Sequence, residues 1–163
     1  MARVLIVGCG CRGRALASSL LAEGFEVRGT TRHAESIEGV EAAGAEGRIA
    51  DPDRLSTLVP HLEGVSVLCW LMGTVVGEPE LVAAIHGPRL ESMLEELVDT
   101  PVRGVVYEAA GSVSPDRLES GARLVARAAA THRMPVRAVD QDPREHEAWL
   151  AAMRAAVRGV LAG

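Results

Sequence analysis

The chain has 163 residues, a length typical of one domain, and 48% of them are hydrophobic, which is enough for a substantial core. The net charge of −5 and the aromatic content of 2% argue against a surface that binds nucleic acid through phosphates or base stacking. No apolar run approaches the roughly 20 residues of a membrane span, and the first residues enter a predicted strand without a signal-peptide pattern. We therefore expect one cytoplasmic domain over residues 1–163, with no partner among nucleic acids or membranes.

The basic residues are unusual because all 17 are arginine and none is lysine. This composition excludes Schiff-base catalysis, a P-loop lysine and any proton relay through lysine. The odd number of cysteines (Cys9, Cys11 and Cys69) does not suggest a disulfide framework, and the C-x-C pair has no further ligand at a metal-binding spacing. We interpret the cysteines as small packing residues and predict no metal site; a redox role for Cys9 or Cys11 is the less favoured alternative.

The first predicted element is a strand, because residues 4–7 (VLIV) form a continuous apolar run typical of a strand buried on both faces. Residues 8–13 follow it directly with the sequence GCGCRG, which matches G-x-G-x-x-G. The apolar spacing of residues 14–24 then predicts a helix that Gly24 can end. A strand, a glycine-rich turn and a helix in this order are typical of a nucleotide-binding site.

Each residue of this turn has a predicted task at the phosphates of a dinucleotide. Gly8 permits the tight turn, Gly10 lets a pyrophosphate approach the backbone, and Gly13 packs the helix against the strand. The amides near Cys11 and Arg12 would point at the phosphates from the positive end of the helix. A glycine-rich turn that holds no ligand is the alternative interpretation.

The second predicted strand, residues 25–32, ends where dinucleotide-binding proteins select their cofactor. An NAD site has an Asp or Glu here, which binds the ribose 2′-hydroxyl. This chain instead has Thr31 and Arg32, whose hydroxyl and guanidinium suit a 2′-phosphate that a carboxylate would repel. The sequence therefore predicts NADP as the cofactor, with NAD less favoured; the alternative is that Arg32 and His33 form a solvated strand end.

Three later junctions share an Asp or Ser followed by Pro, a pattern typical of a helix start. They are Asp51-Pro52, Ser114-Pro115 and Asp142-Pro143. At the first, Asp51 is the predicted cap of a helix; at the last, Glu145 completes a capping-box pattern. One signature at three strand-to-helix junctions predicts repeated βα units.

The remaining segments complete an alternation of strands and helices. Strands are predicted at residues 47–51, 65–71, 104–109 and 136–140, and helices within 34–47, 79–99, 116–133 and 143–161. The helix from Pro79 is interrupted at residues 86–88, either as a kink or as two helices. The pattern predicts an α/β fold with a three-layer, doubly wound parallel sheet of six strands in the order 3-2-1-4-5-6, and no separate substrate domain. The apolar stripe of the final helix is either core or a dimer surface.

Residues 4–32 resemble atypical members of the short-chain dehydrogenase/reductase family, the NAD(P)-dependent epimerase/dehydratase-like proteins. The resemblance implies a Rossmann fold, with the adenine near Asp51 and the nicotinamide ribose near residues 71–74. The cofactor-binding residues predicted in this way are Gly8, Gly10, Cys11, Arg12, Gly13, Thr31, Arg32, Asp51, Leu71, Met72 and Gly73.

The catalytic residues that the resemblance implies are missing from this chain. The family uses a Tyr-x-x-x-Lys pair with a Ser or Thr at the end of the fifth strand. Here the only tyrosine, Tyr107, lies inside that predicted strand, lysine is absent, and Ala110 stands at the Ser position. Glu108 and Ser112 are the nearest substitutes, so the catalytic residues stay unassigned.

Several functions remain open on these grounds. The favoured one is an NADP(H)-binding protein without standard reductase chemistry, either a dinucleotide sensor or a degenerate family member. The alternative is an NADP-dependent oxidoreductase or epimerase-like enzyme that uses Ser112 or Glu108, has His86 and Arg89 along its crevice, and completes a small-molecule site through a homodimer. A methyl donor or FAD is disfavoured because such ligands usually need an acidic residue where Thr31 stands, and a structural domain with an empty site is the remaining alternative.

Overall fold

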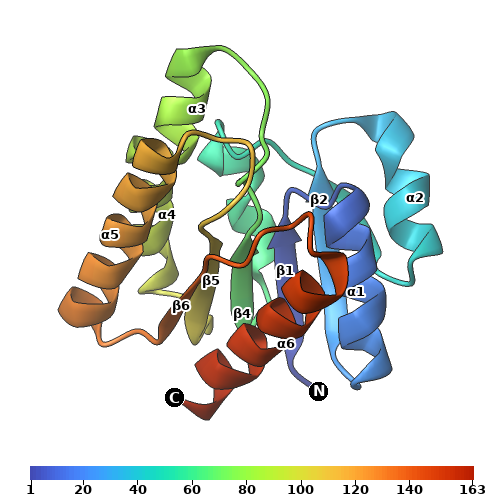
Figure 1. Cartoon of the computed structure of the whole chain (residues 1–163). Coiled ribbons are helices and arrows are strands. Elements are labelled where there is room, and N and C mark those ends of the chain that lie inside the picture. Colours follow the sequence, from blue (N-terminus) through green and yellow to red (C-terminus); the bar gives the residue numbers. More distant parts are fainter.

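A parallel sheet of six strands forms the centre of the molecule, in the order β3-β2-β1-β4-β5-β6 (Figure 1). This computed structural model describes all residues from Met1 to Gly163. The strands are β1 (Arg3–Val7), β2 (Glu26–Thr31), β3 (Glu46–Ile49), β4 (Val67–Trp70), β5 (Gly104–Glu108) and β6 (Val136–Val139). Every neighbouring pair is parallel, so the predicted fold class and strand order are confirmed.

Helices follow the strands and cover both faces of the sheet, because each face is apolar and must be buried. They are α1 (Cys11–Ala22), α2 (Ile37–Ala42), α3 (Pro79–Ile85), α4 (Pro88–Leu97), α5 (Pro115–His132) and α6 (His146–Ala162). The helices α1, α2 and α6 pack on one face, and α3, α4 and α5 pack on the other (Figure 1). The break at residues 86–88 therefore separates two helices, α3 and α4.

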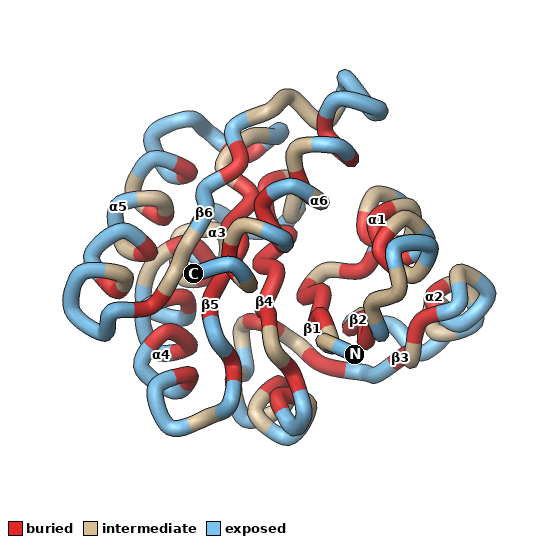
Figure 2. The backbone as a smooth tube through the Cα atoms, turned by 90° about the horizontal axis from the view of Figure 1, so that it is seen from below, coloured by how far each residue is buried: buried red, intermediate tan, exposed pale blue.

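Strand β1 contributes to both halves of the core, as its continuous apolar sequence predicts. Val4 and Ile6 belong to the cluster beneath α1 and α6, whereas Leu5 and Val7 belong to the cluster beneath α4 and α5. All four side chains are completely buried. Figure 2 shows this buried backbone running through the middle of the molecule.

The apolar stripe of α6 is core and not a dimer surface. Trp149, Met153, Val157 and Val160 are completely buried and pack with side chains of the sheet and of α1. The helix therefore closes the same face of the sheet that α1 covers, next to the turn at residues 8–13 (Figure 1).

The predicted helix after Asp51 is wrong. Residues 51–54 form a turn, and the segment continues as the short 3-10 helices Leu55–Thr57 and Val59–Leu62. The Asp51 carboxylate accepts a hydrogen bond of 2.9 Å from the Asp53 amide, so it stabilises the turn and caps no helix. Pro60, which lacks an N–H group, further opposes a longer α-helix here.

The other two predicted caps have different outcomes, since Ser114 does occupy the N-cap position of α5 whereas Asp142 caps no helix. Helix α5 begins at Pro115 as predicted, but the Ser114 side chain makes no capping hydrogen bond. Helix α6 begins at His146, not at residue 143, and Glu145 forms no capping box. The Asp142 carboxylate is occupied by its neighbour Arg144, which donates from its backbone amide at 2.8 Å and from its guanidinium at 2.7 Å. A local side-chain contact has displaced the predicted cap.

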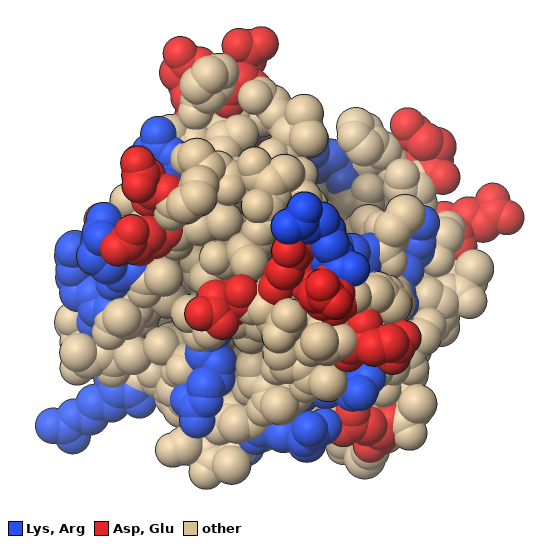
Figure 3. Space-filling view, viewed as in Figure 1, with Lys and Arg blue, Asp and Glu red and all other residues tan.

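The charged residues of the surface are mixed in sign. Figure 3 shows acidic and basic side chains intermingled over one face of the molecule. None of the helices combines the length and the apolar character that a membrane span requires.

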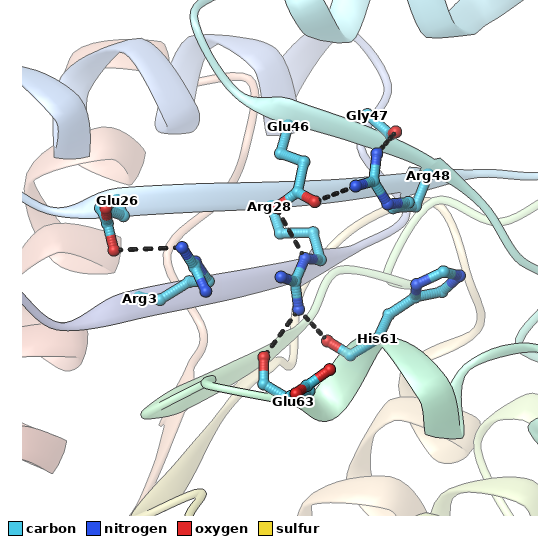
Figure 4. A network of polar contacts seen from close by, with 8 residues as sticks. All are labelled: Arg3, Glu26, Arg28, Glu46, Gly47, Arg48, His61 and Glu63. Carbon is cyan, nitrogen blue, oxygen red and sulfur yellow. Dashed lines mark hydrogen bonds and ion pairs between the residues drawn. The ribbon is translucent and has the colours of Figure 1, made fainter.

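Arg28 on β2 ties three segments together below the carboxyl ends of the strands (Figure 4). Its Nε donates to Glu46 on β3 at 2.9 Å, and its Nη1 donates to the carbonyl oxygens of His61 at 2.6 Å and Glu63 at 2.9 Å. The Arg28 side chain is 11% exposed, so these charge-assisted bonds are partly shielded from water. The network fixes the edge strand β3 against the segment that leads into β4.

Candidate functional site

A cavity of about 450 Å³ lies at the carboxyl ends of β1, β2 and β4. The strand order reverses between β1 and β4, and in open α/β sheets this switch point is where ligands bind. The lining residues come from the turn before α1, the ends of β2 and β3, and the loop after β4. They are Gly8, Cys9, Gly10, Cys11, Arg12, Gly13, Thr30, Thr31, Arg32, His33, Ala50, Pro52, Leu71, Met72, Thr74, Val75 and Val76.

Two glycines of the turn are required by the protein itself. Gly8 has a φ of +88°, and a Cβ added to it would lie 2.6 Å from the carbonyl oxygen of Leu71. A Cβ on Gly13 would lie 3.1 Å from the carbonyl oxygen of Gly8, so this glycine lets α1 pack closely on the turn. Both roles agree with those expected from the sequence.

Gly10 is different, because the protein has no need for glycine there. Its φ is −85° and its backbone is extended, which any residue can adopt. A Cβ added to Gly10 would have no other heavy atom within 4 Å. Since Gly10 lines the cavity, the empty space in front of its backbone is space that a ligand can use.

All the predicted cofactor-binding residues line this cavity except Asp51 and Gly73. Asp51 points into its own turn, and the Gly73 amide donates to the Glu108 carboxylate at 2.8 Å. Thr74 lines the cavity, as its place in the range 71–74 led us to expect, whereas the sequence argument missed the lining residues Cys9, Thr30, His33, Ala50, Pro52, Val75 and Val76. The only feature of the sequence that could have indicated them is that they lie at or just after the end of a predicted strand. That feature does not show which way a side chain points.

The charges around the cavity have one sign. Arg12 and Arg32 line it together with His33, and no Asp or Glu does so. Arg32 makes no ion pair, although the chain as a whole carries a net charge of −5. An acidic protein with a basic cavity is suited to an anionic ligand.

The cysteines divide by burial. Cys9 and Cys69 are buried, and burial raises the pKa of the Cys9 thiol to about 11 and that of Cys69 to about 12. Both thiols are therefore protonated packing groups at neutral pH, as expected. Cys11 is exposed at the cavity, where its sulfur accepts a hydrogen bond from Arg14 at 3.3 Å.

Arg12 reaches from the start of α1 across the sheet. Its Nη2 donates to Thr74 Oγ1 at 2.8 Å and to Glu108 Oε1 at 2.9 Å, and its Cζ lies 5.3 Å from the ring centroid of Trp149. A cation at a helix N-terminus is disfavoured by the helix dipole. The carboxylate and the indole face compensate for this and hold the guanidinium in one place.

Glu108, the last residue of β5, is completely buried. Burial raises the pKa of its carboxyl group, whereas Arg12, the Gly73 amide and Trp149 lower it. Trp149 lies close enough to act on the carboxyl group, although neither its Nε1 nor Oε2 of Glu108 makes a hydrogen bond of ordinary geometry. The expectation that Glu108 needs a partner is met by Arg12, and its full burial separates it from any substrate.

The expectation that His86 and Arg89 line the crevice is wrong. His86 is completely buried, with Nε2 at 2.8 Å from the Met72 carbonyl oxygen and Nδ1 at 2.6 Å from the Tyr107 hydroxyl. Because a carbonyl only accepts, Nε2 donates to Met72, and burial favours the neutral ring, in which Nδ1 accepts from the Tyr107 hydroxyl. Burial lowers the pKa of His86 accordingly. Arg89 instead pairs with Asp53 at 3.1 Å on the surface.

A second cavity of about 500 Å³ adjoins the first at Thr74. It lies at the carboxyl ends of β5 and β6, and five of its eight lining residues have polar or charged side chains. Its walls are Thr74, Ala110, Gly111, Ser112, Asp140, Asp142, Pro143 and Arg144. Ser112 is thus exposed beside the first cavity, and the Thr74 side chain, held by Arg12, lies between the two.

The comparison of this architecture with solved structures decides its fold. The chain superposes on a protein described as an NAD-dependent epimerase/dehydratase from Bacillus halodurans with a TM-score of 0.72, at 19% identity over 88% of this chain and 71% of that one. It has the Rossmann fold. The sequence matches no protein-family model, and no curated protein is significantly similar to it.

Two further neighbours were solved with a cofactor. A short-chain dehydrogenase/reductase superfamily protein from Agrobacterium tumefaciens with bound NAD gives a TM-score of 0.69 at 18% identity, over 85% of this chain and 48% of that one. The triphenylmethane reductase of Citrobacter sp. complexed with NADP(H) gives 0.61 at 19% identity, over 84% and 48%. The chain thus spans about half the length of these two proteins. The predicted resemblance to short-chain dehydrogenase and epimerase/dehydratase proteins is confirmed at the level of the fold.

Proposed function

We propose that the cavity binds a nicotinamide dinucleotide, with its pyrophosphate against the turn at residues 8–13. The observation that carries this proposal is Gly10, which lines the cavity and has open space in front of its backbone where a pyrophosphate could approach. The free amides at the start of α1 suit a phosphate there. The basic side chains in the lining and the absence of an Asp or Glu there fit an anion, and they further disfavour FAD or a methyl donor, which usually need a carboxylate at the end of β2.

The preferred form of this ligand is NADP(H). Thr31, Arg32 and His33 stand where the ribose 2′ position of an adenosine would lie, and Arg32 has no carboxylate to neutralise it. A guanidinium without a partner can form a bidentate pair with a 2′-phosphate. The two neighbours with NAD or NADP(H) support a nicotinamide cofactor but do not separate the two.

The protein acts as a binding protein or sensor in this proposal and not as a standard reductase. Its single tyrosine, Tyr107, is completely buried and donates its hydroxyl proton to His86, and the chain has no lysine. The second cavity supports the other candidate, an NADP-dependent oxidoreductase that holds a small polar substrate beside Ser112.

The test is a calorimetric titration of the protein with NADPH and NADH, repeated on Arg32→Asp. We expect NADPH to bind at least about tenfold more tightly, a difference of roughly 1.4 kcal/mol, and Arg32→Asp to lose this preference. Arg127→Asp on α5 is the matched control, because it makes the same charge change at an exposed site outside the cavity. Equal binding of both nucleotides would refute the NADP preference, and absence of binding would refute the function.

A second assay separates the sensor from the enzyme. Purified protein with NADPH is incubated with a broad panel of carbonyl compounds, and oxidation of the nicotinamide is followed by its absorbance. Tight binding without turnover would favour the sensor. Turnover that disappears in Ser112→Ala would favour the oxidoreductase.

A further inference from the structure

Arg12 has more hydrogen-bonding capacity than its protein partners use. A guanidinium carries five N–H donors. Both of its side-chain hydrogen bonds in this structure come from Nη2, so Nε and Nη1 are without a protein partner. The side chain is 20% exposed and lines the first cavity, beside the amides at the start of α1. A positive charge with unused donors is therefore fixed at the place where a diphosphate would lie.

Glu108 controls how much of that charge a ligand would meet. With both groups ionised, the Arg12–Glu108 pair has no net charge. The second carboxylate oxygen, Oε2, is buried and has no hydrogen-bond partner, so it can accept a proton while Oε1 keeps its bonds to Arg12 and Gly73. Burial raises the pKa of this carboxyl group, so it is protonated more easily than an exposed glutamate.

We propose that Arg12 binds the diphosphate of the ligand through its free donors, and that Glu108 takes up a proton from solvent when the diphosphate arrives. The inference rests on the proposed function, since it concerns the same cavity. Two negative charges near Arg12 compete with the Glu108 carboxylate for the guanidinium. Protonation of Oε2 then relieves the repulsion between the buried carboxylate and the diphosphate, and leaves Arg12 as an uncompensated cation. Glu108 is thus a positioning residue and Arg12 a ligand-binding residue.

Few groups near Glu108 other than Glu108 itself could account for a proton taken up when the ligand binds. Arg12 faces it from α1, the Gly73 amide from the loop after β4, and Trp149 from α6. Tyr107, its neighbour on β5, donates to His86 in the other half of the core. His33 also lines the cavity, so a variant that removes its imidazole serves as a control.

Proton uptake is measured by calorimetry of ligand binding in buffers of different ionisation enthalpy, between pH 6 and 8. NADH is the direct probe, because it has no group that titrates in this range. We expect a fraction of a proton to be taken up per NADH bound, rising toward pH 6, in the parent and in His33→Gln but not in Glu108→Gln. With NADPH, the difference between the parent and Glu108→Gln reports the same proton, since the 2′-phosphate contributes equally to both.

The role of Arg12 is tested without leaving a buried carboxylate unpaired. The double variant Arg12→Gln/Glu108→Gln is compared with Glu108→Gln, and we expect its affinity for NADPH to be at least tenfold lower. Arg14→Gln, which removes the same charge from the same helix outside the cavity lining, should change the affinity less than twofold. Binding without proton uptake in the parent, or a double variant within twofold of Glu108→Gln, would overturn this inference alone. Failure of both nucleotides to bind would overturn the proposed function as well.

Discussion

Replacement of Gly10 by alanine separates the needs of a ligand from the needs of the fold. The added methyl group would meet no heavy atom within 4 Å, and a φ of −85° suits alanine. Alanine restricts the unfolded chain, which stabilises by about 0.4–1 kcal/mol, whereas glycine is the better residue at the start of a helix by about 0.5–1 kcal/mol. The two effects nearly cancel, so Gly10→Ala should unfold within about 1 kcal/mol of the parent.

Gly8→Ala is the matched comparison two positions earlier. Here the methyl group would lie 2.6 Å from the Leu71 carbonyl oxygen, and the φ of +88° is strained for alanine. Strain of about 1–3 kcal/mol and overpacking of about 1–3 kcal/mol together predict a loss of about 2–6 kcal/mol in the free energy of unfolding. Urea unfolding followed by circular dichroism measures this quantity for all three proteins.

The binding result should be the reverse of the stability result. In Gly10→Ala the methyl group occupies the space proposed for the pyrophosphate, so we expect NADPH affinity to fall at least about tenfold, or 1.4 kcal/mol, while the fold is retained. A Gly10→Ala protein that binds NADPH as tightly as the parent would show that the ligand does not approach this backbone. A Gly10→Ala protein with a much lower free energy of unfolding than the parent would show that the protein itself needs glycine at this position.

Two further predictions concern stability. Burial lowers the pKa of His86, so below about pH 6.5 the unfolded chain binds a proton that the folded chain does not, and the free energy of unfolding should fall by up to about 1.4 kcal/mol per pH unit. Urea unfolding at pH 7 and pH 5 should show a weaker dependence in His86→Gln and an unchanged one in the exposed His132→Gln; equal slopes in all three would contradict the buried neutral ring. Arg28→Leu should lower the free energy of unfolding by about 2–3 kcal/mol, because Oε2 of Glu46 and two carbonyl oxygens lose their donor, although Arg48 still donates to Oε1 of Glu46. NADPH affinity measured by calorimetry should be unchanged, and a loss of binding in a folded Arg28→Leu protein would mean that this network shapes the cavity.

The strands and their order were predictable because one physical signal dominates them. A central parallel strand is buried on both faces, so the sequences of β1 and β4 are continuous apolar runs. The G-x-G-x-x-G turn after β1 identifies it as the first strand of the fold. The alternation with helices then leaves few topologies that obey right-handed crossovers. The location of the cavity followed from the topology, and Gly8 and Gly13 from their place in the turn.

Contacts between short polar side chains and distant segments could not be predicted in this way. Asp51 and Asp142 match the pattern of a helix cap, but each carboxylate finds a nearer partner, the Asp53 amide in one case and Arg144 in the other. The pairing of Arg12 with Glu108 joins residues 96 positions apart. No local pattern indicates such a contact, because it arises only when the sheet brings the start of α1 beside the end of β5.

Three polar side chains from separate parts of the chain hold the loop after β4, and this bears on what the protein can do. Glu108 accepts from the Gly73 amide, His86 donates to the Met72 carbonyl oxygen, and Arg12 donates to the Thr74 hydroxyl. Three consecutive residues of the loop that borders both cavities are thus fixed by side chains from three elements. Glu108 and His86 are completely buried and engaged with the loop, so neither is placed to act as a general acid or base on a substrate. The end of β5, where a reductase of the resembled family would place its catalytic hydroxyl, here holds the loop that borders the cavities, and Ser112 is the exposed hydroxyl nearest to it in the outer cavity.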